Sequence, residues 1–122
     1  MKRVLVADDA SFMRQMIRDI IEPEGYEVVG EASDGMEVVD QFVELSPDLV
    51  MMDIVMPKRS GIDAVKGIVD IDPGACVVMC SALGQEALVM EAMQAGAKDF
   101  IVKPFKPDCV ITTLARALEK ED

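Results

Sequence analysis

The stretch RVLVADDASFMR, residues 3–14, joins a short apolar run to two adjacent carboxylates, Asp8 and Asp9, just where a helical pattern begins. The run is too short for a helix, and its apolar residues follow one another without alternation, which is typical of a strand buried on both faces. The stretch therefore predicts a strand, a short acidic turn and a helix in direct succession.

Apolar runs of the same kind recur along the chain at 26–32, 48–53, 75–81 and 99–103. Helical patterns separate these runs and a last one follows them, at about 11–22, 34–45, 62–71, 85–95 and from Pro107 onward. Strands that alternate with helices through short connections are expected to be parallel, with helices on both faces of the sheet. We therefore predict an α/β fold with a doubly wound five-stranded parallel sheet, flavodoxin-like, in strand order 2-1-3-4-5.

The helices are expected to turn apolar faces toward this sheet. Ser33 or Asp34 should cap the second helix, which should bury Val38, Val39 and Phe42. The first helix should carry one apolar stripe, made of Phe12, Met13, Met16, Ile17, Ile20 and Ile21.

The composition restricts the range of functions. At 122 residues the chain fits one domain, and we expect it to be a monomer. Twelve basic residues against 23 acidic ones give a net charge of −11, which repels nucleic acids and anionic membranes. No apolar run is long enough for a signal peptide or a membrane span, so we expect a soluble, cytoplasmic protein.

The residue types available for chemistry are also restricted. The chain has no His, which excludes imidazole acid–base catalysis and His metal ligands. Cys76, Cys80 and Cys109 are odd in number and lack a metal-ligand spacing, so we expect buried thiols outside disulfides in a reducing compartment. Any chemistry must use carboxylates, hydroxyls, amines or thiols.

Polar residues stand at the ends of four predicted strands. Asp8 and Asp9 follow the first strand, whereas Asp53, Ser81 and Lys103 close the third, fourth and fifth. Parallel strands end at one edge of the sheet, and ligands bind there where the strand order reverses, here between the first and third strands. We therefore expect the three carboxylates to converge.

Converging carboxylates need a cation. Two carboxylates about 4 Å apart repel by roughly 4 kcal/mol at an effective dielectric constant of about 20, which corresponds to about three pKa units. Either one group is protonated at neutral pH or a cation lies among them. An all-oxygen ligand set favours a hard divalent ion, and Mg²⁺ with retained waters suits it. Three Asp and one Lys sum to a charge of −2, which a divalent ion cancels.

Each of these residues has an ordinary structural explanation when taken alone. Asp9 or Ser81 could cap a helix, Asp53 could be a turn residue ahead of Pro57, and Lys103 could be a solvated charge. Their joint placement on one edge favours a site instead. A metal-neutralised carboxylate there can attack a phosphoryl group that the metal and an ammonium hold, with a hydrogen bond from the serine. The residues thus predict Asp53 as a phosphoryl acceptor.

Four motifs carry a family resemblance, namely ADDA at 7–10, MMDIVMPKRSG at 51–61, CSALGQ at 80–85 and GAKDFIVKPF at 96–105. Together they resemble the receiver domain of two-component response regulators, and more narrowly the single-domain chemotaxis regulators of the CheY type. The resemblance covers essentially the whole chain and implies one receiver domain over residues 1–122.

The resemblance implies a role for each acidic residue. Asp53 would take its phosphoryl group from the phosphohistidine of a CheA-like sensor histidine kinase. Asp9 would bind Mg²⁺ directly, Asp8 would bind it chiefly through water, Asp53 would also belong to the metal site, and Val55 would add its backbone carbonyl.

The resemblance also implies a conformational switch. Lys103 would pair with the phosphoryl oxygens, and its bond to Pro104 would be cis. Ser81 would move toward the phosphate on activation, and Phe100 would turn inward behind it. The surface made by the fourth helix, fifth strand and fifth helix would then bind a flagellar or archaellar switch or adaptor protein.

Some residues depart from the family pattern. Phe100 is often Tyr in this family, so a partner contact that needs a hydroxyl is absent. Val55 and Leu83 are apolar at positions that control the access of water to the phosphoryl group, which predicts slow self-hydrolysis. Lys58 and Arg59 add positive charge beside the acceptor and receive no role from the pattern.

We expect a phosphorylation-gated signalling module and not a turnover enzyme. The alternative is a phosphorelay intermediate that passes its phosphoryl group to another His protein. A phosphatase of the haloacid-dehalogenase type would need an acid in place of Val55, and a flavodoxin-like electron carrier would need a Ser-, Thr- and Gly-rich loop in place of the acidic turn. The chain ends at Asp122, directly after the last predicted helix, so no output domain is expected on it.

Overall fold

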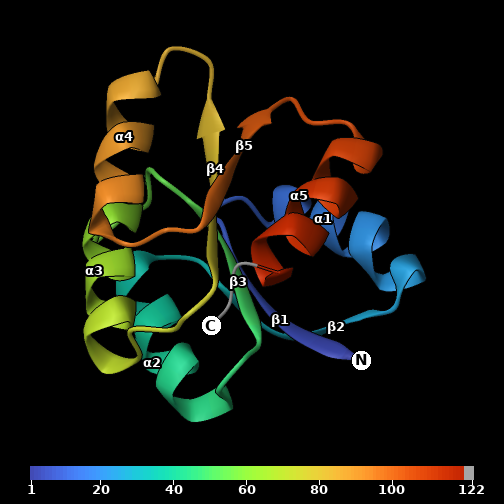
Figure 1. Cartoon of the computed structure of the whole chain (residues 1–122), viewed down its shortest axis with the longest axis horizontal. Helices are drawn as coiled ribbons and strands as arrows, with labels where there is room; N and C mark the ends of the chain where they lie inside the picture. Colours follow the sequence, from blue (N-terminus) through green and yellow to red (C-terminus); the bar gives the residue numbers. More distant parts are fainter. Residues whose placement is uncertain (120–122) are drawn as a thin grey trace.

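The computed structural model describes residues 1–119, which form an open sheet covered by helices on both faces (Figure 1). The strands are β1 Lys2–Ala7, β2 Tyr26–Ala32, β3 Leu49–Asp53, β4 Val77–Ala82 and β5 Asp99–Lys103. The helices are α1 Ser11–Ile21, the 3-10 turn η1 Glu22–Glu24, α2 Gly35–Leu45, α3 Gly61–Ile71, α4 Glu86–Ala95 and α5 Pro107–Glu119. Within this part of the chain, none of the helices is both long and apolar enough to cross a membrane.

The sheet has the predicted topology. Over residues 1–119 its five strands pair in parallel in the order β2-β1-β3-β4-β5. The fold class and strand order expected from the alternating pattern are therefore confirmed. The order reverses between β1 and β3, where Ala7 at the end of one strand pairs with Met52 near the end of the other. This register brings the turn after β1 beside Asp53.

Two hydrophobic cores lie on the two faces of the sheet. Because neighbouring residues of a strand point to opposite faces, each buried strand contributes to both cores. In β1, Val4 and Val6 pack with α1 and α5, whereas Leu5 and Ala7 pack with α2, α3 and α4. Figure 1 shows the same division, with α1 and α5 on one side of the strands and the other three helices opposite.

The inward stripe predicted for α1 is wrong at two positions. Ile17 and Ile21 are buried, but Phe12 is 68% exposed and Met16 is 44% exposed. The six residues of the predicted stripe span about half of the helix circumference, which is more than the sheet and α5 cover. One flank of the stripe is therefore left at the surface, close to the acidic turn.

The start of α2 is capped by Asp34 and not by Ser33. The Asp34 side chain accepts hydrogen bonds from the backbone N–H groups of Met36 at 2.9 Å and Glu37 at 2.8 Å. The residues expected to face inward from this helix are buried or half-buried, which confirms its orientation.

The three thiols differ in their surroundings. Cys76 and Cys80 are buried, and burial raises the pKa of the Cys80 thiol to about 12, so this group stays protonated at neutral pH. Cys109 is exposed in the first turn of α5, so the expectation of burial is wrong for this residue.

Candidate functional site

Three carboxylates meet at the carboxyl edge of the sheet. One oxygen from each of Asp8, Asp9 and Asp53 lies within 4.8 Å of the other two. The first two residues follow β1 and the third ends β3, so the parallel register of these neighbouring strands brings them together. The predicted convergence is confirmed.

Lys103 joins this cluster from the end of β5. Its Nζ donates a hydrogen bond to Asp8 Oδ2 at 2.9 Å and another to Asp53 Oδ2 at 3.0 Å. The peptide bond between Lys103 and Pro104 is cis, as the resemblance implied. One ammonium against three carboxylates leaves a local charge of −2.

The pKa shifts of this pair follow from their shared burial. Burial raises the pKa of the Asp53 carboxyl, and the hydrogen bond and charge of Lys103 only partly oppose it. Burial lowers the pKa of the Lys103 ammonium, but its hydrogen bonds to Asp8 and Asp53 outweigh this effect and raise it. The lysine therefore stays charged, whereas the charge on Asp53 carries a desolvation cost that a further cation would relieve.

The three carboxylates are held in different ways. Asp8 is buried, at 2% exposure, and its Oδ1 accepts a hydrogen bond from the Ala10 N–H at 2.9 Å. Asp9 is exposed, and Asp53 is half-buried with Oδ1 at 3.3 Å from the backbone N–H of Val55. Asp8 thus has both carboxylate oxygens engaged by protein groups, while Asp9 faces solvent.

This donor set fits Mg²⁺. The ion prefers carboxylate oxygens and water in an octahedron with bond lengths of about 2.1 Å, so neighbouring and opposite oxygens lie roughly 3 to 4 Å apart. The carboxylate oxygens here, within 4.8 Å of one another, are close to that spacing. The exposure of Asp9 leaves room for retained waters. The role of the Val55 carbonyl as a further ligand stays a prediction.

A glycine that the sequence pattern did not single out allows the loop after β3 to close on the site. A Cβ at Gly61 would lie 2.3 Å from the Asp53 carbonyl oxygen, which is too close for any side chain. The Gly61 N–H donates to the Ile54 carbonyl at 2.7 Å, so the first residue of α3 packs directly on the acceptor strand. It closes the motif at 51–61, but nothing in that motif showed that its backbone lies against Asp53.

The two basic residues of this loop lie beside other elements. Lys58 Nζ is 3.5 Å from Oδ2 of Asp34, the residue that caps α2. Lys58 also has a positive φ of 67°, which a non-glycine residue adopts at a cost. Arg59 Nη2 donates to the Asp63 carbonyl at 2.9 Å. Both residues therefore tie the loop to neighbouring helices, a role the sequence did not reveal.

The residues expected to switch lie around a cavity next to the site. Ser81 at the end of β4 is buried, whereas Phe100 in β5 is 39% exposed. Both contribute to a cavity of about 300 Å³ between α4 and β5, lined among others by Ser81, Leu83, Val89, Met90, Phe100 and Val102. The cavity offers space into which a side chain at its rim can turn.

Residues 4–115 match the family model described as the response regulator receiver domain. This chain belongs to the response-regulator receiver family. It is 59% identical to the chemotaxis protein CheY of Thermotoga maritima, over 93% of this chain and 94% of that protein. It is 53% identical to the CheY of Bacillus subtilis, over 95% of this chain and 97% of that protein.

The fold of this chain also matches that of solved structures. The crystal structure of the CheX–CheY–BeF₃–Mg²⁺ complex from Borrelia burgdorferi superposes with a TM-score of 0.90 at 37% identity, covering 94% of this chain and 87% of that one. The chain is therefore a CheY-type receiver, consistent with chemotaxis signalling. Receivers are signalling domains rather than turnover enzymes, and they generally bind Mg²⁺ at an acidic pocket, which here is the cluster of Asp8, Asp9 and Asp53.

Proposed function

We propose that this receiver is a chemotaxis response regulator that accepts a phosphoryl group on Asp53 in the presence of Mg²⁺ and then binds a partner in the motility apparatus. The observation that carries the proposal is the contact of Asp53 Oδ2 with Lys103 Nζ at 3.0 Å beside two further carboxylates. The names of the similar CheY proteins support the link to chemotaxis.

The transfer step uses groups from this chain and from a kinase. A carboxylate oxygen of Asp53 attacks the phosphorus of a phosphohistidine on a CheA-like sensor histidine kinase. The N–P bond breaks, its electron pair returns to the imidazole, and the new O–P bond makes an acyl phosphate. Lys103 then shares its ammonium between Asp8 and the phosphoryl oxygens.

The metal site is proposed on the same cluster. Asp9, Asp53 and the Val55 carbonyl would hold Mg²⁺ directly, and Asp8 would hold it chiefly through water. Bound Mg²⁺ supplies positive charge for the carboxylates and for the oxygens of the entering phosphoryl group. This contribution matters because burial already raises the pKa of Asp53.

The output step is proposed to use the cavity beside Ser81. In the phosphorylated protein the Ser81 hydroxyl donates a hydrogen bond to the phosphoryl group, and Phe100 turns from its half-exposed position into the cavity of about 300 Å³. Contacts that exist only in the phosphorylated state bias the equilibrium between the two arrangements. The changed α4–β5–α5 surface then binds a flagellar or archaellar switch or adaptor protein in the cytoplasm.

The proposal is tested by phosphorylation with radiolabelled acetyl phosphate and Mg²⁺. The unmodified protein should take up label and Asp53→Ala should take up none, because the variant lacks the nucleophile. NMR shifts induced by beryllofluoride and Mg²⁺ should spread from Asp53 through Ser81 to Phe100. Undiminished labelling of the variant would contradict the assignment, and passage of label from Asp53 to a second His protein would identify a relay intermediate instead.

A further inference from the structure

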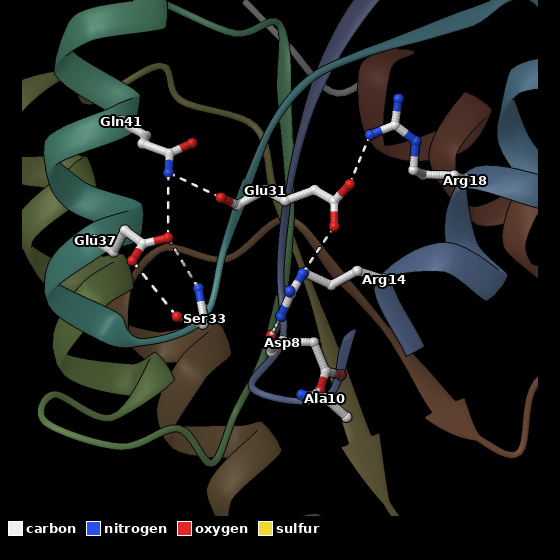
Figure 2. A network of polar contacts seen from close by, with 8 residues as sticks. All are labelled: Asp8, Ala10, Arg14, Arg18, Glu31, Ser33, Glu37 and Gln41. Atoms are coloured by element: carbon white, nitrogen blue, oxygen red, sulfur yellow. Dashed lines mark hydrogen bonds and ion pairs between the residues drawn. The ribbon is translucent and has the colours of Figure 1, made fainter. Parts of the chain in front are cut away.

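An arginine from α1 reaches back to the acidic turn, as Figure 2 shows. Arg14 Nη1 donates a hydrogen bond to the backbone carbonyl of Asp8 at 2.5 Å, and Nε donates to Glu31 Oε1 at 2.8 Å. The Arg14 side chain is largely buried, at 16% exposure. The guanidinium therefore links the turn before α1 to the neighbouring strand β2.

Glu31 is itself held from a second direction. Its other oxygen, Oε2, accepts a hydrogen bond from Arg18 Nη1 at 2.6 Å, one turn further along α1 (Figure 2). The backbone of β2 also holds the turn, because the Asp8 N–H donates to the Ala32 carbonyl at 3.0 Å. Both the amide and the carbonyl of Asp8 are thus anchored to β2, the first directly and the second through Arg14.

The Asp8 carbonyl matters because it belongs to the peptide that joins the two acidic residues. A peptide group is planar, so a fixed carbonyl oxygen also fixes the amide and the Cα position of Asp9. Within residues 1–119, no hydrogen bond holds the Asp9 carboxylate itself. The direction of this exposed side chain depends on the backbone that carries it.

We propose that Arg14 is a positioning residue for the metal site. By holding the Asp8–Asp9 peptide it orients Asp9 for Mg²⁺, and Glu31 keeps the guanidinium on the carbonyl and away from the carboxylates. The inference rests on the proposed function, since the metal site belongs to it. Groups that orient metal ligands commonly change metal affinity by roughly 10- to 100-fold when they are removed.

Arg18 provides a matched control for a merely structural role. It makes the same kind of ion pair with Glu31, at 2.6 Å, and another with Glu22, at 3.2 Å, and neither of these partners is a residue of the acidic turn. If the arginines only fasten α1 to β2, their removal should have the same consequences. If Arg14 positions Asp9, only its removal should affect the metal.

The experiment is a Mg²⁺ titration of the unphosphorylated protein, followed by the amide NMR signals of Asp8 and Asp9. We expect Arg14→Met to raise the Mg²⁺ dissociation constant roughly tenfold, and Arg18→Met to change it less than about twofold, as expected for a group that does not orient a ligand. Thermal unfolding without Mg²⁺ should show similar, modest losses of stability for both variants. The Mg²⁺ dissociation constant of Arg14→Lys should lie between those of the unmodified protein and Arg14→Met, because one ammonium cannot reproduce the guanidinium fork that bridges Asp8 and Glu31.

Four outcomes separate the possibilities. Equal Mg²⁺ affinities for the Arg14→Met and Arg18→Met proteins would overturn the positioning role. If Arg14→Met does not fold, an unchanged dissociation constant for Arg14→Lys would overturn it equally. An unmodified protein that binds no Mg²⁺ would contradict the proposed function itself, whereas normal binding by the unmodified protein together with an unaffected Arg14→Met variant would contradict only this inference.

Discussion

On the β1–α1 side of the site every polar atom of Asp8 has a protein partner, whereas on the β4–α4 side the chain leaves a cavity beside Ser81. The Asp8 N–H donates to the Ala32 carbonyl, and the Asp8 carbonyl accepts from Arg14. Its two carboxylate oxygens accept from the Ala10 N–H and from the Lys103 ammonium. Hydrogen bonds from α1 and its N-cap residue, from β2 and from β5 therefore hold this side of the site in one arrangement.

The opposite side has fewer such constraints. Side chains cap α2 and α3, namely Asp34 and Ser60, whereas no side-chain hydrogen bond caps the start of α1 or of α4. Leu83 in the preceding loop is 77% exposed, and Phe100 on β5 is 39% exposed. A segment with few buried contacts opens at a low free-energy cost. The contrast agrees with the proposed function, in which the preorganised edge would hold the metal and the phosphoryl group and the less constrained surface would bind the partner.

The largest effect should come from replacing Lys103, whose ammonium joins the carboxylates of Asp8 and Asp53. We expect Lys103→Met to lower the free energy of unfolding by about 3 kcal/mol without Mg²⁺, because breaking a buried ion pair leaves an uncompensated charge. Added Mg²⁺ should restore much of this loss, since the ion supplies the missing charge. Urea unfolding followed by circular dichroism measures both quantities.

Lys106 serves as the control for this substitution, because it is an exposed lysine in the same segment. Lys106→Met should change the free energy of unfolding by no more than about 0.5 kcal/mol. Equal losses for the two variants would show that the site lysine acts only as a surface charge.

Two glycines extend the comparison to the loops that follow β3 and β4. Alanine at Gly61 would bring a Cβ to 2.3 Å from the Asp53 carbonyl oxygen, whereas a Cβ at Gly84 meets no atom within 4 Å. We expect Gly61→Ala to lower the unfolding free energy by about 1–3 kcal/mol through overpacking and to slow phosphorylation.

Gly84→Ala should lower the free energy of unfolding by about 1 kcal/mol, because the backbone φ of +88° is unfavourable for any residue with a side chain. It should leave the phosphorylation rate near normal. Unfolding curves and labelling rates for the two variants test this difference. A larger decrease in the labelling rate for Gly84→Ala than for Gly61→Ala would contradict this assignment of the rigid and the adaptable loop.

The smallest effect concerns the ion pairs that anchor α1. Burial raises the pKa of Glu31, but hydrogen bonds from Arg14 and Arg18 outweigh it and hold the pKa below its usual value of 4.5. A carboxylate with a lowered pKa stabilises the fold above its unfolded-state pKa, and this contribution is lost as the pH falls through the folded-state pKa.

Glu31→Gln should therefore lower the unfolding free energy most at neutral pH, and its difference from the unmodified protein should shrink as the pH falls below 4.5. The difference should stay below about 1 kcal/mol, because the Glu31 side chain is partly exposed. Urea unfolding at several pH values measures it. A difference that grows toward acid pH would contradict the sign.

Much of the site was predictable because its residues mark the ends of strands. The runs that end at Asp8, Asp53, Ser81 and Lys103 are recognisable locally, and a parallel sheet must bring such ends to one edge. The exposure of Phe12 was not predictable, since an apolar stripe does not reveal how wide a face its neighbours cover. Gly61 was missed for a related reason, because its meaning depends on the backbone of β3 lying against it.

Local pattern alone was thus sufficient for the alternation of strands and helices, their parallel order and the list of residues at the acidic edge. These features depend on short-range periodicity and on turn chemistry, which a one-dimensional chain displays directly. The contacts of Arg14 with Asp8 and Glu31, and of Lys58 with Asp34, required the folded chain. A long, flexible cationic side chain can reach several carboxylates, and only the packing of distant segments selects which one it meets.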